Sequence, residues 1–197
     1  MIERIKYKNI KPQQNKFFFD NLEKLLSLIS PDRIIEIGTG RGATTRYISE
    51  ICKNILPNTK IKTFDIAQRH NFQSSDMLDN VQFYGDNIFN YHKGILLKPE
   101  EITDFLSQSG PNLILCDGGN KIREFNILSY FIKKGDVLMA HDYAPNREIF
   151  ENEYKGIIWD HCEITDKDIQ DCVEKNNLGP YNEDLIKKTA WVAKIKL

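Results

Sequence analysis

The sequence of 197 residues lacks the features that mark several classes of protein. It contains no apolar run of 18 residues, so we expect no transmembrane span and no membrane partner. Its first residues, MIERIKYKNIKPQQ, lack the apolar segment of a secretory signal, which makes the cytoplasm the expected location. Neither sign of charge dominates, because 27 lysine and arginine residues stand against 28 aspartate and glutamate residues. We therefore expect no nucleic-acid partner. The expected partner is a small-molecule substrate, and the protein could also form a homo-oligomer.

Cysteine is also scarce, and its spacing excludes a disulfide or zinc framework. The four cysteines form no C-x-x-C pair, and the position of Cys162 beside His161 matches no standard zinc site. Two of them, Cys52 and Cys116, fall in apolar patterns that indicate small core residues. The chain thus has the composition of a protein from a reducing compartment.

The length fits a single domain over residues 1–197, with a loose polar arm at 1–13 and a helix at 14–30. Apolar strand patterns then alternate with helical ones, and residues 66–79 and 85–96 have the composition of loops. This alternation predicts an α/β fold: a Rossmann-like, doubly wound, mostly parallel sheet of seven strands that ends in an antiparallel strand. We expect strands at 32–38, 60–66, 80–86, 112–117, 136–142, 156–164 and 189–197, and further helices at 44–56, 98–110, 121–135, after Pro145 and at 166–177.

Acidic side chains mark the ends of five of these strands. They are Glu36, Asp65, Asp86, Asp117 and Asp142, the last of which follows His141. In a doubly wound sheet, ligands bind outside the carboxyl ends of the strands. We therefore expect the functional site at this edge of the sheet.

The stretch EIGTGRGATT joins the first of these strands to a helix and holds three glycines, Gly38, Gly40 and Gly42. A glycine turn between a strand and a helix N-terminus cradles nucleotide-like ligands. Gly38, Gly40 and Ala43 fit the dinucleotide fingerprint, with Asp65 at the usual distance for ribose hydroxyls. A turn that only lets helix and strand pack would also use glycine.

The spacing of Glu36 and the three glycines, E-x-G-x-G-x-G, resembles the first motif of the class I S-adenosylmethionine-dependent methyltransferases. The resemblance implies that the loop approaches the amino-acid portion of the cofactor and that its acid positions the cofactor's ammonium. It also implies a ribose-binding acid at Asp65. The adenine side would be at Asp86, which as a residue before Asn87 is equally suited to form a turn. The implied cofactor contacts are Glu36, Gly38, Thr39, Gly40, Gly42, Asp65, Asp86 and Asp117.

Two further stretches, CDGG and HDY, each follow an apolar strand and place Asp117 and Asp142 at neighbouring strand ends. Two such carboxylates repel each other unless a cation lies between them. The pair resembles the metal-dependent O-methyltransferases, in particular the group that contains the cephalosporin hydroxylase-like proteins. The resemblance implies a divalent metal, magnesium or manganese, held by Asp117, His141 and Asp142. His141 stands where the family has an acid, so it is either a ligand or the general base; Lys121 is the other candidate base.

These patterns lead to one main hypothesis and two alternatives. The main hypothesis is an S-adenosylmethionine-dependent methyltransferase that acts on the oxygen of a small hydroxylated substrate, such as a sugar or natural product, with possible help from a metal. The alternatives are a minimal NAD-type oxidoreductase and a non-catalytic Rossmann-like binding module. A dehydrogenase would usually need a second nucleotide-binding half or a substrate domain, for which 197 residues leave no room. Residues 144–197 contain no motif to which we can assign a chemical role.

Overall fold

A computed structural model describes residues 10, 13–66 and 78–197 of the chain. Most of the predicted arm at 1–13, and most of the predicted loop at 66–79, lie outside the described residues. Within the described ranges, no helix combines the length and the apolar character that crossing a membrane requires.

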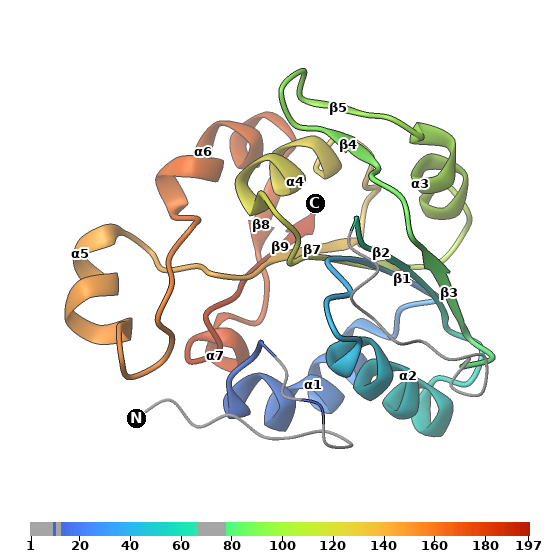
Figure 1. Cartoon of the computed structure of the whole chain (residues 1–197), viewed down its shortest axis with the longest axis horizontal. Helices are drawn as coiled ribbons and strands as arrows, with labels where there is room; N and C mark the ends of the chain where they lie inside the picture. Colours follow the sequence, from blue (N-terminus) through green and yellow to red (C-terminus); the bar gives the residue numbers. More distant parts are fainter. Residues whose placement is uncertain (1–9, 11–12, 67–77) are drawn as a thin grey trace.

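The described chain forms a seven-stranded sheet in the order β3-β2-β1-β6-β7-β9-β8, with helices on both faces (Figure 1). The first five strands in this order pair in parallel, whereas β9 is antiparallel to both of its neighbours. The predicted fold class is therefore confirmed. The strands are β1 (Arg33–Ile37), β2 (Lys60–Phe64), β3 (Val81–Tyr84), β6 (Asn112–Cys116), β7 (Val137–Ala140), β8 (Leu178–Pro180) and β9 (Val192–Lys196).

Helices cover the two faces because buried side chains alternate along the central strands. One face packs against α3, α4 and α6, and the other against α1, α2 and α7 (Figure 1). Along β6, for example, Ile114 and Cys116 belong to the first core and Leu113 and Leu115 to the second. The helices are α1 (Lys16–Ile29), α2 (Ala43–Ile55), α3 (Pro99–Leu106), α4 (Lys121–Leu128), α5 (Arg147–Ile149), α6 (Asp166–Lys175) and α7 (Glu183–Ile186), and a π-helical turn spans Phe150–Tyr154.

Local capping explains several helix boundaries. The side chain of Asn15 accepts a hydrogen bond from the Phe18 amide and begins α1. Thr165 and Asp168 form the capping box that the sequence predicts before α6.

Three predicted elements differ from the structure. The strand expected at 156–164 is wrong: this segment is turns and irregular chain, joined to Tyr143 by a single bridge at Ile164, and β8 takes the seventh place in the sheet. The helix expected at 121–135 ends at Leu128, because the chain tightens into turns in which the Ser129 hydroxyl donates to the Asn126 carbonyl. The predicted loop at 85–96 contains a short hairpin, β4 (Phe89–Asn90) with β5 (Ile95–Leu96).

Candidate active site

The order of strands reverses at β1: the chain first adds β2 and β3 on one side of it, and then β6 and β7 on the other. A cavity of about 560 Å³ lies at this switch point, where doubly wound sheets bind ligands. Six predicted cofactor residues line it, namely Gly38, Thr39, Gly40, Asp65, Asp86 and Asp117. Glu36 and Gly42 do not belong to the lining.

The glycines of the loop serve different purposes. Gly38 has φ +94°, and a Cβ there would lie 2.2 Å from the carbonyl oxygen of Asp117, so glycine lets the loop pack against the end of β6. Gly42, at φ +73°, begins α2. A Cβ on Gly40 would meet no atom within 4 Å, which leaves Gly40 as the glycine whose open side a ligand can approach.

Glu36 holds the loop through hydroxyl groups. Its Oε2 accepts hydrogen bonds from Thr45 (2.5 Å) and Thr63 (2.6 Å), and the Thr63 hydroxyl lies 2.6 Å from that of Thr39. Burial raises the pKa of Glu36 to about 7 despite these hydrogen bonds. The structure therefore places Glu36 behind the loop, as a residue that positions Thr39.

The two downstream acids of the predicted cofactor site reach the cavity. The Oδ2 atom of Asp65 accepts a hydrogen bond of 2.6 Å from the backbone N–H of Gly40, which ties the end of β2 to the loop. Asp86 is exposed and pairs with the Lys98 ammonium at 2.6 Å. Both residues thus belong to the lining of the cavity.

Beside the cavity, the ends of β6 and β7 bring together the predicted acid–histidine cluster. The Nδ1 atom of His141 lies 3.0 Å from Oδ1 of Asp117 and 3.4 Å from Oδ1 of Asp142. Since both neighbours are hydrogen-bond acceptors, we place a proton on Nδ1. Nε2 is buried and, within the described part of the chain, has no hydrogen-bond partner. The imidazole lies between the rings of Trp159 and Trp191, with centroid distances of 4.9 and 5.0 Å.

Each of the three N–H groups of the Lys121 ammonium has an acceptor nearby. Its ammonium donates to the Gly118 carbonyl at 2.9 Å, and lies 3.1 Å from Oδ2 of Asp142 and 3.2 Å from Oε2 of Glu163. Burial alone would lower the pKa of Lys121, but Asp117, Asp142 and Glu163 raise it above its ordinary value. Burial likewise opposes the charged form of Asp142, but His141 and the Lys121 ammonium hold the pKa of Asp142 below its usual value. Lys121 is therefore a fixed cation, which does not suit the predicted role of a base.

The residues of this cluster do not fit the predicted divalent metal. The Lys121 ammonium already lies against the carboxylates of Asp142 and Asp117, at 3.1 and 4.0 Å, and the Nδ1 atom of His141 carries a proton toward them. In the described ranges, no group of three or more histidine, cysteine, aspartate or glutamate side chains is arranged to hold an ion. The charge balance that a metal would supply comes from the lysine.

Two residues that the sequence did not single out complete the cluster. The buried side chain of Gln14 bridges Asp117, to which it donates at 2.7 Å, and the indole of Trp191, which donates to it at 2.8 Å. Glu163 binds both the backbone N–H and the ammonium of Lys121. Neither residue belongs to a motif, so no signal in the sequence pointed to them.

A third residue missed in the sequence, Glu124, supports the loop after β6. Its fully buried carboxylate accepts from the backbone N–H groups of Gly118 and Asn120, each at 3.0 Å, and from the Tyr91 hydroxyl at 2.8 Å. Burial raises its pKa. Its position in the first turn of the predicted helix at 121–135 is the signal that could have revealed it.

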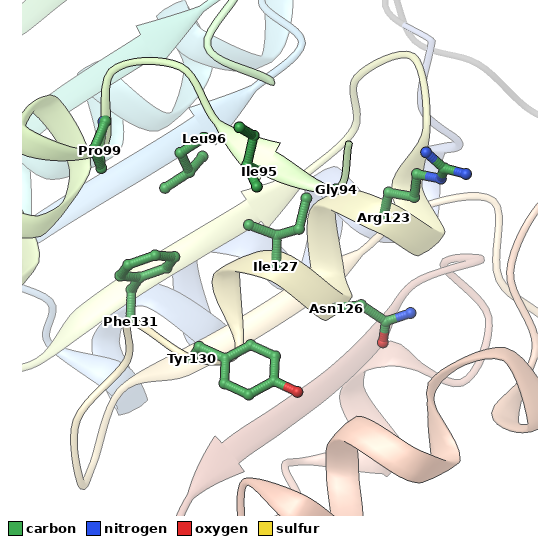
Figure 2. A pocket seen from close by; sticks show the side chains of 9 residues that line it. All are labelled: Gly94, Ile95, Leu96, Pro99, Arg123, Asn126, Ile127, Tyr130 and Phe131. Carbon is green, nitrogen blue, oxygen red and sulfur yellow. The ribbon is translucent and has the colours of Figure 1, made fainter. Parts of the chain in front are cut away.

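A second hollow, of about 580 Å³, lies between the hairpin β4–β5 and α4 (Figure 2). Apolar side chains dominate it, and Arg123 is the charged residue in its lining. None of the predicted site residues lines it. The chemistry-bearing side chains gather instead around the cavity at the switch point.

Solved structures show what this arrangement resembles. The apo-structure of CmcI aligns with 98% of the chain and 76% of its own, at a TM-score of 0.69 and 10% identity. A protein from Staphylococcus aureus described as a caffeoyl-CoA O-methyltransferase aligns over 94% of the chain and 86% of its own, with a TM-score of 0.61 and 13% identity. The fold is that of the S-adenosylmethionine-dependent O-methyltransferases. The resemblance seen in the sequence is thereby confirmed at the level of the fold.

Sequence comparison points the same way at lower coverage. A protein-L-isoaspartate O-methyltransferase from Desulfotalea psychrophila is 29% identical in an alignment 142 positions long, which covers 64% of this chain and 62% of that protein. The chain thus spans less than two thirds of the length of this curated relative. No family model matches the sequence.

Proposed function

We propose that the protein is an S-adenosylmethionine-dependent methyltransferase that acts on a hydroxyl oxygen of a small molecule. The observation that carries this proposal is that the glycine loop, Asp65 and Asp117 line one cavity, beside the buried pair of His141 and Asp117. The O-methyltransferase fold supports the choice of cofactor, as does the similarity to CmcI in its Mg–SAM form, which aligns at a TM-score of 0.64.

The cofactor would lie between the ends of β1 and β2. The open side of Gly40 admits it to the loop, and Asp65 is placed to accept hydrogen bonds from the ribose hydroxyls. Asp86, which lines the same cavity, would lie toward the base. When bound, S-adenosylmethionine supplies an activated methyl group and leaves as S-adenosylhomocysteine.

The acceptor would bind on the other side of Asp117, toward β7. There a hydroxyl must lose its proton as its oxygen takes the methyl group. The Asp117 carboxylate, which lines the cavity, is the proposed destination of that proton, because Lys121 is already protonated and its donors are engaged. The buried His141 would hold the Asp117 carboxylate in position through the hydrogen bond that its Nδ1 donates.

Metal assistance enters no step of this proposal, since the donor set does not fit an ion. The predicted metal stays testable through chelation. We expect turnover that is unchanged by EDTA, whereas a loss restored by Mg²⁺ or Mn²⁺ would show that the cluster rearranges to bind one.

The proposal is tested by comparing ligands and then measuring turnover. S-adenosylhomocysteine at a hundredfold excess over Kd should stabilise the protein by about 2.7 kcal/mol, and NAD⁺ should not. Stabilisation by NAD⁺ alone would favour the oxidoreductase. Incubation with S-adenosylmethionine and a panel of hydroxyl compounds should release S-adenosylhomocysteine; tight binding without release across the panel would favour a binding module.

A further inference from the structure

The hollow between the hairpin β4–β5 and α4 has the size of a small-molecule site (Figure 2). Its volume of about 580 Å³ falls within the range of about 300 to 1,000 Å³ that is usual for such sites. Two of its hydrophobic side chains stay open to water, Ile95 at 47% exposure and Tyr130 at 55%. Since contact with an apolar molecule would remove this surface from water, the hollow is suited to bind one.

Buried contacts on both sides of the hollow fix its walls before any ligand enters. Tyr91, the residue after β4, donates its hydroxyl hydrogen at 2.8 Å to the buried carboxylate of Glu124 in α4. Leu96 of β5 is buried in the same core as Phe125 and Leu128 of α4. A ligand that binds between such walls does not have to order them first, which favours its affinity.

The lining is divided into an apolar end and a polar end. Figure 2 shows Pro99 and Phe131 at one end and Arg123 and Asn126 at the other, with the Ile127 side chain between them. Of the lining residues in the described part of the chain, Arg123 alone carries a charge. A molecule that matches this division has an apolar body and a negative group at one end.

The surroundings of the polar end leave its positive charge in place. Among the residues that the structure describes, the Arg123 guanidinium has no hydrogen-bond or ion-pair partner. A second cation, the Lys175 ammonium, lies 5.3 Å from the centre of the Tyr130 ring. Acids stand close in the chain but do not line the hollow; they are Glu100 beside the apolar end, and Asp171 and Glu174 on α6. A guanidinium pairs with a carboxylate through two parallel hydrogen bonds, so a carboxylate is the anion that suits this end.

We propose that this hollow binds an aliphatic monocarboxylate, with its chain over Ile95, Leu96 and Ile127 and its carboxylate on Arg123. The hollow and the proposed cofactor cavity share no lining residue in the described ranges. The inference therefore stands or fails independently of the proposed function.

The test compares ligands that share one alkyl chain and differ in charge: octanoate, octanamide and octylammonium. Calorimetric titration should give the highest affinity for octanoate and the lowest for octylammonium. Octanoate should exceed octanamide by about threefold to fivefold, the range expected of a partly exposed ion pair. Hexanoate should bind more weakly than octanoate, by about fourfold for each methylene group that would otherwise be fully buried.

Three variants assign the binding to its residues. Arg123→Gln should abolish the preference for octanoate over octanamide and leave octanamide binding unchanged. Lys24→Gln is the matched control, because it changes the net charge equally at an exposed position of α1, on the opposite face of the sheet. Ile95→Ser should weaken all the octyl ligands by a similar factor and keep their order. Because octanamide is the internal reference, a general folding defect would not change the ratios.

Saturating S-adenosylhomocysteine tells the two cavities apart. Octanoate should bind equally with and without it, whereas displacement of octanoate would place the acid in the cofactor cavity and overturn the inference, though not the proposed function. Absence of octanoate binding, equal binding of the octyl ligands, or a preference that survives Arg123→Gln would overturn the inference as well. If S-adenosylhomocysteine does not bind, the proposed function fails, and the comparison of Arg123→Gln with the wild type still decides the inference.

Discussion

The two halves of the carboxyl edge of the sheet are held together by different forces. At the ends of β1 and β2, neutral hydroxyls and backbone groups surround Glu36 and shape an open loop. At the ends of β6 and β7, an ammonium, an imidazole and three carboxylates fix one another. The first half is suited to hold a ligand by shape, whereas the second imposes charge on whatever lies beside it.

The largest effect should follow from removing the single ammonium of the second half. Lys121→Met leaves three carboxylates without their cation, so we expect a loss of about 3 to 5 kcal/mol in the free energy of unfolding. Lys155→Met is the matched control, because its pair with Glu151 is exposed and contributes less than about 1 kcal/mol. Urea denaturation measures both; equal effects would show that Lys121 is not central to this half.

The junction between the halves can be broken at Gly38. Gly38→Ala adds a Cβ where the Asp117 carbonyl oxygen would be 2.2 Å away, at a φ of +94°, and should cost about 3 kcal/mol. Gly40→Ala has the space for a Cβ and only the backbone strain of φ +55°, so it should cost about 1 kcal/mol. Gly40→Ala should also weaken S-adenosylhomocysteine binding. Similar stability losses in the two variants would contradict the different roles given to these glycines.

A pH series tests the burial of Glu36 in the first half. Its pKa of about 7 in the folded protein exceeds the ordinary value of 4.5, so the folded state holds the proton more tightly than the unfolded chain. The stability of the wild type should therefore fall as pH rises from about 5 to 8, with about 2 kcal/mol of that fall due to this group. Glu36→Gln should remove that part of the slope. A slope that persists unchanged in the variant would place the titration elsewhere.

A smaller effect than that of Lys121, Gly38 or Glu36 concerns the cover of the second half. Trp159 donates its indole N–H to Oδ1 of Asp142 at 2.6 Å, and Asp142 has a positive φ of 57° that such contacts help to hold. Trp159→Phe keeps the ring and removes the donor, which should cost about 1.5 kcal/mol and reduce turnover. Adding Asp142→Asn to this variant should cost less than the sum of the single changes if the two residues are coupled.

The same contrast explains how far the sequence could lead. The first half is encoded locally: a short apolar strand, three glycines and an acid at the next strand end are enough to predict a nucleotide-like site on a doubly wound sheet. The alternation of strands and helices also predicts the sheet. The strand wrongly predicted at 156–164 shows where the pattern fails. This apolar segment is irregular chain, and within it Trp159 contacts Asp142 and Glu163 contacts Lys121.

The second half depends on contacts between residues that are far apart in the chain. The sequence places Asp117 and Asp142 together because their strands are adjacent. It does not show which side chains bind the charged groups of this cluster. Gln14 reaches Asp117 across 103 positions, and Glu163 reaches Lys121 across 42. In the sequence, Asp117 and Asp142 form a repulsive pair that a metal would relieve; in the structure, the Lys121 ammonium lies against both carboxylates.

The central claim is that the first half binds the cofactor and the second half governs the acceptor. Calorimetric titration of S-adenosylhomocysteine into Asp65→Asn and Asp142→Asn tests it most directly. We expect Asp65→Asn to lose about tenfold or more in affinity, through the loss of the ribose-facing carboxylate, and Asp142→Asn to bind within about twofold of the wild type while turnover falls. The opposite pattern, with unchanged binding in Asp65→Asn and weakened binding in Asp142→Asn, would contradict the account.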